Sequence, residues 1–199
     1  MKRLHRADLF CWSSLQEALD IDFNSFLWAN KRTNVLIDPL PLSAHDEQHL
    51  RELGGAQWIV ITNSFHVRGA KEIGQRLGAK IAGPMAERED FPLRCERWLR
   101  DNDEVVPGLR VRELDGSKTP GELALVLEET TLISGDLIRA HRADSLILLG
   151  PEKIKSPEKA RASIARLLDL HPKIETVLVG DGWFTFRHGG DVLRTLIQK

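Results

Sequence analysis

Residues 57–82 combine a buried strand, a helix and a second strand. The run QWIVIT at 57–62 is continuous and rich in β-branched residues, which indicates a strand that is covered on both faces. A helix is expected over residues 66–77, ended by Gly78, and a further strand over 80–82. Such a passage imposes a right-handed crossover between parallel strands. The chain must therefore contain a sheet with parallel strands and a helix on its face.

The other elements predicted from the sequence repeat this theme in two halves. Strands are expected at 9–12, 23–29, 34–38, 109–114, 123–127, 131–134 and 176–179, and helices at 43–53, 156–170 and 190–198. Ser43 is expected to be the N-cap of the first of these helices. Residues 139–155 have no pattern that assigns them to an element. Two α/β halves that each have a sheet to cover are most economically packed as two sheets face to face with helices outside.

Composition limits the class of protein. No Pro-, Gly- or Ser-rich linker divides the 199 residues, so we expect one domain over 1–199. The N-terminus lacks the apolar stretch of a secretory signal, and no segment approaches the ~20 apolar residues that span a bilayer. A net charge of −1 with scattered basic residues argues against nucleic acid as a partner. We expect a cytoplasmic protein with no membrane partner and with Cys11 and Cys95 as free thiols.

Polar side chains follow the predicted strands at their carboxyl ends. In open α/β sheets, ligands bind beyond these ends. The polar residues stand in the turns NSFHVRG at 63–69, GSKTPG at 116–121, GD at 135–136 and GDG at 180–182. The residues predicted to line a ligand cleft are Asn63, His66, Arg68, Lys118, Asp136 and Asp181.

The order of these turns resembles the metallo-β-lactamase superfamily. The segments that carry the resemblance are LIDP at 36–39, the strand ending in Thr62, TPGE at 119–122, SGDLI at 134–138 and VLVGDG at 177–182. Together they extend from about residue 34 to residue 183. The resemblance implies an α/β fold that is a four-layer αβ/βα sandwich, with two packed mixed sheets and helices outside. If the protein is an enzyme, the resemblance implies a hydrolase.

The first metal-binding motif of that family is altered in this sequence. Family members carry T-H-x-H-x-D-H after the corresponding strand. The same register here supplies Asn63, Phe65, Val67 and Arg68 where the three His and the Asp would stand. Phe65 and Val67 have no group that binds a metal, and the charge of Arg68 repels one.

The remaining family ligands are also largely replaced. Ser117 or Lys118 stands where the next His would be, and Asp181 replaces the His of a G-H-G turn. Asp136 alone matches the family's metal-bridging Asp. These replacements therefore argue against a dinuclear zinc centre of the family's type, and we expect no resident cofactor.

Opposite charges replace the metal ligands on both sides of this site. Two convergent carboxylates without a counter-charge repel each other. We therefore expect Arg68 and Lys118 to stand where the metals would be and to pair with Asp136 and Asp181. A guanidinium of Arg68 more than about 6 Å from both carboxylates would contradict this hypothesis.

His66 allows two interpretations. In the family's register it is a spacer whose side chain points away from the site, so we expect a structural role at the start of the helix. Alternatively, His66, Asp136 and Asp181 form a mononuclear site for one divalent ion, which would be zinc, iron or manganese.

Three classes of function follow from these observations. The first is a binding protein whose cleft attracts a small anionic ligand through Arg68 and Lys118. The second is a metal-dependent hydrolase with the atypical mononuclear site. The third is a structural protein that uses the fold to form a homodimer.

Overall fold

A seven-stranded mixed sheet is built from the N-terminal half of the chain. The structure is a computed structural model and describes residues 1–30 and 32–198. The strands in spatial order are β1 (Lys2–Arg3), β2 (Leu9–Gln16), β3 (Ile21–Trp28), β4 (Val35–Ile37), β5 (Trp58–Val60), β6 (Lys80–Pro84) and β7 (Arg97–Leu99). Strands β1 to β4 are antiparallel, and β4 to β7 are parallel. The parallel pair predicted for residues 57–82 is confirmed.

A four-stranded mixed sheet comes from the C-terminal half. Its order is β13 (Thr176–Val179), β10 (Thr131–Ser134), β9 (Glu122–Leu127) and β8 (Leu109–Leu114). Only the β10–β13 pair is parallel. The β9–β10 hairpin turns at Glu128 and Glu129, whose φ angles of +44° and +62° match the twist of a tight hairpin.

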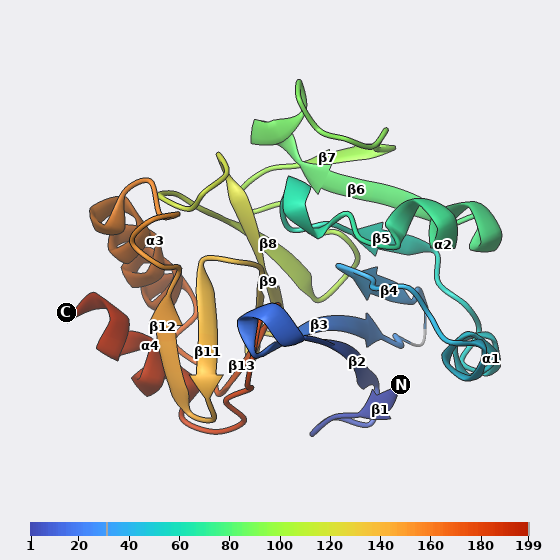
Figure 1. The fold of residues 1–199 in the computed structure, drawn as a ribbon, viewed down its shortest axis with the longest axis horizontal. Coiled ribbons are helices and arrows are strands. Elements are labelled where there is room, and N and C mark those ends of the chain that lie inside the picture. The colour runs from blue at the N-terminus through green and yellow to red at the C-terminus, as the bar shows by residue number, and fades with distance from the viewer. Residues whose placement is uncertain (31, 199) are drawn as a thin grey trace.

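The helices lie outside the two sheets. Helices α1 (Ala44–Glu52) and α2 (Ala70–Leu77) contribute apolar side chains to a core on the outer face of the first sheet. Helices α3 (Pro157–Leu170) and α4 (Gly189–Ile197) do the same for the second sheet. A third core, with Phe26, Trp28 and Leu125, fills the space between the sheets. This is the predicted four-layer sandwich (Figure 1).

Two predictions about local structure require correction. The helix expected over 66–77 is split into a 3₁₀ turn η2 (Ser64–His66) and α2, because Arg68 has a left-handed backbone with φ +37° that interrupts the helical path. The unassigned residues 139–155 contain most of a separate hairpin, β11 (Ile138–Arg142) with β12 (Ser145–Leu148).

The short elements complete the chain. They are the 3₁₀ turns η1 (Glu17–Leu19), between β2 and β3, and η3 (Met85–Glu87), after β6. Ser43 caps α1 by accepting from the backbone N–H of Asp46, as the sequence predicts.

Cys11 and Cys95 are both buried free thiols. Among the residues described, we find no helix with the length and apolarity needed to cross a membrane.

Candidate functional site

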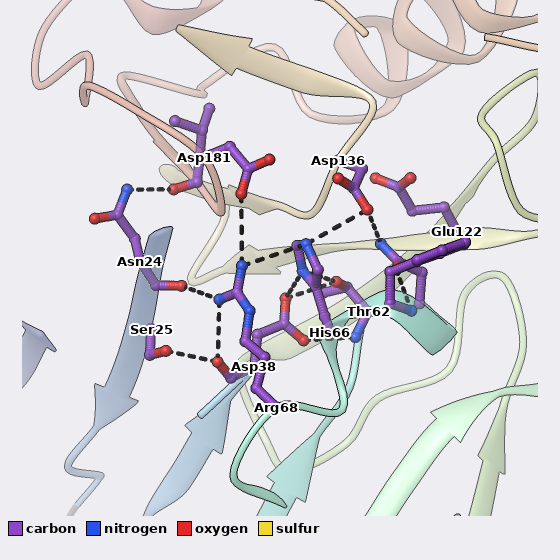
Figure 2. Close-up of polar contacts among 12 residues, drawn as sticks. Asn24, Ser25, Asp38, Thr62, His66, Arg68, Glu122, Asp136 and Asp181 are labelled. Carbon is purple, nitrogen blue, oxygen red and sulfur yellow. Dashed lines mark hydrogen bonds and ion pairs between the residues drawn. The ribbon is translucent and has the colours of Figure 1, made fainter. Parts of the chain in front are cut away.

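The turns after β5, β10 and β13 converge at one end of the two sheets. Figure 2 shows Asp136 and Asp181 entering from the second sheet, facing His66 and Arg68 from the first. The backbone approaches closely here. A Cβ on Gly135 would lie 2.6 Å from Oγ1 of Thr62, and a Cβ on Gly180 would lie 2.8 Å from Cε1 of His66. The glycines of the GD and GDG turns thus let the two halves meet.

His66 is fixed by Asp38 in the interior. Nδ1 of His66 lies 2.8 Å from Oδ2 of Asp38 and 3.2 Å from Oγ1 of Thr62. Asp38 also accepts from the backbone N–H of Thr62 at 2.8 Å and from its hydroxyl at 2.6 Å. Both His66 and Asp38 are buried. This network fixes the imidazole so that Nε2 faces Asp136.

One oxygen of Asp136 has three partners. Oδ2 accepts from Nδ2 of Asn63 at 3.0 Å, pairs with Nζ of Lys118 at 2.8 Å and lies 3.4 Å from Nε2 of His66. Lys118 also lies over the ring of Phe65, 4.0 Å from its centroid. Asp136 is therefore held by one ammonium, one amide and the imidazole.

Asp181 is held by two guanidinium groups. Nη2 of Arg139 lies 2.5 Å from Oδ2, and Nη2 of Arg68 lies 3.5 Å from Oδ1. Nη1 of Arg68 donates to the backbone carbonyls of Asn24, at 2.6 Å, and Asp38, at 3.3 Å. Arg68 therefore ties β3 and the end of β4 to the second sheet.

Glu122 is a further buried acid beside the site. Its Oε2 accepts from the hydroxyl of Ser117 at 2.5 Å, and its Oε1 accepts from the backbone N–H of Leu137 at 2.8 Å. No cation pairs with it among the residues described. Burial and the nearby charge of Asp136 raise the pKa of Glu122 to about 7.

The charges around His66 set the protonation of the other groups. Burial alone would lower the pKa of His66, but Asp38 and Asp136 outweigh it and raise the pKa to about 9. Burial likewise opposes ionisation of Asp136, but His66 and Lys118 hold the pKa of this carboxyl well below its usual range. The pKa of Asp181 is raised by its burial, against the opposing charge of His66. The network therefore favours the protonated form of His66.

These shifts predict that stability falls as the pH rises above about 5. The pKa of Glu122 rises on folding from 4.5 to about 7, and that of His66 from 6.5 to about 9, so the folded state retains protons that the unfolded state releases. Both contributions are complete at low pH and are lost by about pH 9. Thermal unfolding between pH 5 and 9 measures this. Glu122→Gln should remove the part of the decline below pH 7, and an unchanged profile in that variant would contradict the assignment.

The six residues predicted to line a cleft lie in one connected network. They are Asn63, His66, Arg68, Lys118, Asp136 and Asp181. The predicted pairing of Arg68 and Lys118 with the two aspartates is confirmed by these contacts. The expected orientation of His66 is wrong, because its side chain points into the site and contacts Asp136.

Sequence reasoning missed two residues of the network. Arg139 lies in the hairpin that had no assignable pattern, so nothing in the sequence placed it near Asp181. Glu122 directly follows the TPG turn and begins β9, in which every residue is buried. A carboxylate at the start of an apolar strand was therefore a signal in the sequence for a buried acid near the site.

A metal ion would have to use atoms that already have partners. Donor atoms of His66, Asp136 and Asp181 all lie within 4.8 Å of one another and form a possible ligand set. Lys118, Arg68 and Arg139 contact the same carboxylates. The residues present thus form a carboxylate–imidazole cluster whose negative charge is balanced by fixed side-chain cations.

Comparison with known proteins gives one family. The family model described as the metallo-beta-lactamase superfamily matches residues 1–199. The solved structures that resemble the chain include a metallo-beta-lactamase from Pontibacter korlensis, with 17% identity, a TM-score of 0.75 and coverage of 99% of this chain and 98% of that one. The DIM-1 metallo-beta-lactamase has 15% identity and a TM-score of 0.77, covering 99% and 94%. The mono-zinc form of FIM-1 from Pseudomonas aeruginosa has 14% identity and a TM-score of 0.71, covering 96% and 90%. No curated protein sequence matches the chain.

Proposed function

Because the chain belongs to the metallo-β-lactamase superfamily, we propose that it retains the family's cleft but binds a small anionic ligand there without the family's two metal ions. The observation that carries this proposal is the ammonium of Lys118, 2.8 Å from the carboxylate of Asp136. Either Lys118 or its neighbour Ser117 stands where the family places a metal-ligating His before the TPG turn. The ammonium of Lys118 therefore supplies a positive charge close to the position that a metal ion takes in the family.

The residues present do not fit a dinuclear zinc centre. A metal ligand needs a free lone pair, and Oδ2 of Asp136 already has three polar partners. Both oxygens of Asp181 face guanidinium groups. Two dications beside three fixed side-chain cations would face strong repulsion at these short distances. No step of a zinc-dependent reaction is therefore assigned to this chain.

The accessible cation of the network supports binding of an anion. The side chain of Lys118 is 20% exposed, whereas that of Arg68 is 7% exposed. A cavity of about 460 Å³ lies beside Lys118, and its lining combines cations with acids: Lys118, Arg88 and Arg100 with Glu87, Glu89 and Asp90. This volume accommodates a small molecule. A ligand that carries an anionic group, together with hydroxyl or amino groups that donate to Glu87, matches this lining.

Inorganic phosphate provides the first test. If it binds with a Kd of about 1 mM, 10 mM phosphate should stabilise the protein by about 1.4 kcal/mol and raise the Tm by roughly 3–5 °C. Lys118→Gln should abolish this shift. Lys153→Gln, at an exposed lysine outside the cavity, is the matched control and should preserve it. A shift that survives in Lys118→Gln would refute the proposed role of this residue.

A mononuclear metal site is the alternative, favoured by the cluster of His66, Asp136 and Asp181 within 4.8 Å. Metal content measured by mass spectrometry, on protein purified without chelator or tag-bound metal, separates the two functions. About one zinc, iron or manganese per chain, lost in Asp136→Ala, would support a metal-dependent hydrolase. Metal below about 0.1 per chain would support the anion-binding function. A homodimer stays a prediction from the sequence.

A further inference from the structure

We propose a second ligand site that binds an amphipathic anion, in a groove between the N-terminal strands and the loop after β13. The groove encloses about 860 Å³, within the range of small-molecule sites. Strands β1 to β3 form one wall, and residues 182–188 form the other. Of these segments, β1 and the loop after β13 lie toward the lower edge of the molecule in Figure 1. We call this feature the edge groove.

The lining of the edge groove is apolar and aromatic. Leu4, Cys11 and Val192 contribute aliphatic or thiol surface. Trp183 and Phe186 also line it and remain 60% and 41% exposed. Rings of this size are normally covered in a folded protein, and exposed aromatic surface at a concave site marks a binding region.

The aromatic wall is held in place before any ligand arrives. The ring of Phe186 packs against Phe184, with centroids 5.9 Å apart, and against His5 at 5.6 Å. Phe184 in turn contacts Phe26 of the core at 5.7 Å. Because the ring of Phe186 is already fixed by packing, covering it with a flat or acyl group costs little additional ordering.

One end of the edge groove is basic. Lys2 and Arg3 of β1 pair with Cys11 and Phe10 of β2, whereas Asp22 pairs with Leu15, about four residues farther along β2. This separates the cations from that acid by roughly 13 Å at the usual strand rise. Lys2 shares the face of Cys11, which lines the groove, whereas Arg3 lies opposite Phe10 on the other face of the sheet. Arg187 also lines the groove, and neither Lys2 nor Arg187 has an ion-pair partner in the described part of the chain.

These features select one chemical class of ligand. A long acyl or flat aromatic body would cover Trp183 and Phe186, and an anionic head would meet Lys2 and Arg187. Asp144, on the β11–β12 turn, is the other acid of the lining. Neutral apolar molecules would leave the cations without a partner.

The edge groove is distinct from the cleft at Lys118. Between them, Asn24 donates from Nδ2 to the carbonyls of Val179, at 3.0 Å, and Gly182, at 2.7 Å. The carbonyl of Asn24 accepts from Arg68 on the cleft side. The cavity at Lys118 and the edge groove have no lining residue in common. Binding in the edge groove therefore does not depend on the proposed function of the cleft.

Fluorescence of 8-anilinonaphthalene-1-sulfonate, an aromatic anion, measures binding to the edge groove. We expect one micromolar site per chain. Trp183→Ala should weaken binding about tenfold, since burial of an indole ring is worth at least 1.4 kcal/mol. Lys2→Glu with Arg187→Glu should weaken it at least as much. Leu19→Ala, at an exposed apolar side chain outside the groove, and Lys153→Glu with Lys173→Glu are the matched controls and should change nothing.

Three outcomes would overturn the inference. Binding that survives in both groove variants, or that is lost in Lys118→Gln, would place the probe elsewhere. Equally tight binding of the uncharged N-phenyl-1-naphthylamine would remove the selectivity for an anion. A dimer in solution that Trp183→Ala dissociates would assign the groove to a second copy of the chain. Circular dichroism and Tm confirm that each variant is folded before binding is compared.

Discussion

Asp38→Ala should destabilise the protein by about 3–5 kcal/mol, the cost of breaking a buried ion pair by removing one partner. Asp38 is buried and lies 2.8 Å from the imidazole of His66. Its removal would leave His66 beside Arg68, which lies 3.4 Å away. It would also leave the N–H and hydroxyl of Thr62 without their acceptor. Alanine at φ +47° adds backbone strain to this loss.

Urea denaturation of purified protein measures this effect. Asp38→Asn preserves the shape and tolerates the left-handed backbone, so it should lose less stability than Asp38→Ala. Asp22→Ala, at an exposed aspartate outside the ion pairs of the described residues, should change stability by less than about 0.5 kcal/mol. A loss below about 1 kcal/mol for Asp38→Ala would show that the Asp38–His66 pair contributes little to the fold.

Arg68→Ala combined with Lys118→Ala should convert the cluster into a zinc site. The two substitutions remove the cations nearest His66 and Asp136, and they free one oxygen of Asp181. Ligand atoms within 4.8 Å of one another need only a small contraction to meet a zinc ion with bonds of about 2.0–2.2 Å. We expect zinc content to rise from below about 0.1 to about one per chain, and added zinc to raise the Tm of this variant alone.

Two controls make the result specific. Asp136→Ala in the same background should abolish zinc retention. Arg88→Ala with Arg100→Ala, at two cations that line the neighbouring cavity without touching the cluster, should leave the protein free of zinc. If the double variant at Arg68 and Lys118 binds no zinc, the side-chain cations are not what excludes a metal.

The two proposed sites differ in the chemistry of the residues that line them. The cleft is made of ionised groups, and its accessible part is Lys118 beside a small polar cavity. The edge groove is aromatic, with cations at one end. Asn24 lines the edge groove and accepts from Arg68 of the charged network. Each site has its own variants, so the failure of one proposal leaves the other intact.

Local patterns in the sequence determined most of the elements and the residues at their ends. The run at 57–62 predicted its parallel pairing because a strand buried on both faces needs helices over it. Ser43 predicted the start of α1 because its hydroxyl satisfies a free backbone N–H. The turns after each strand placed Asn63, Asp136 and Asp181 together, because the ends of neighbouring strands meet at one edge.

Only the tertiary structure decided how these residues contact one another. The left-handed backbone of Arg68 shortens the predicted helix, and the imidazole of His66 points into the site between Asp38 and Asp136. Arg139 reaches Asp181 from a hairpin that the sequence did not reveal. Short-range patterns report backbone preference and burial, whereas the direction of a side chain and its ion-pair partner depend on residues distant in sequence. For that reason the sequence determined the fold and six residues of the charged network, and the packing of the two halves determined how these residues contact one another.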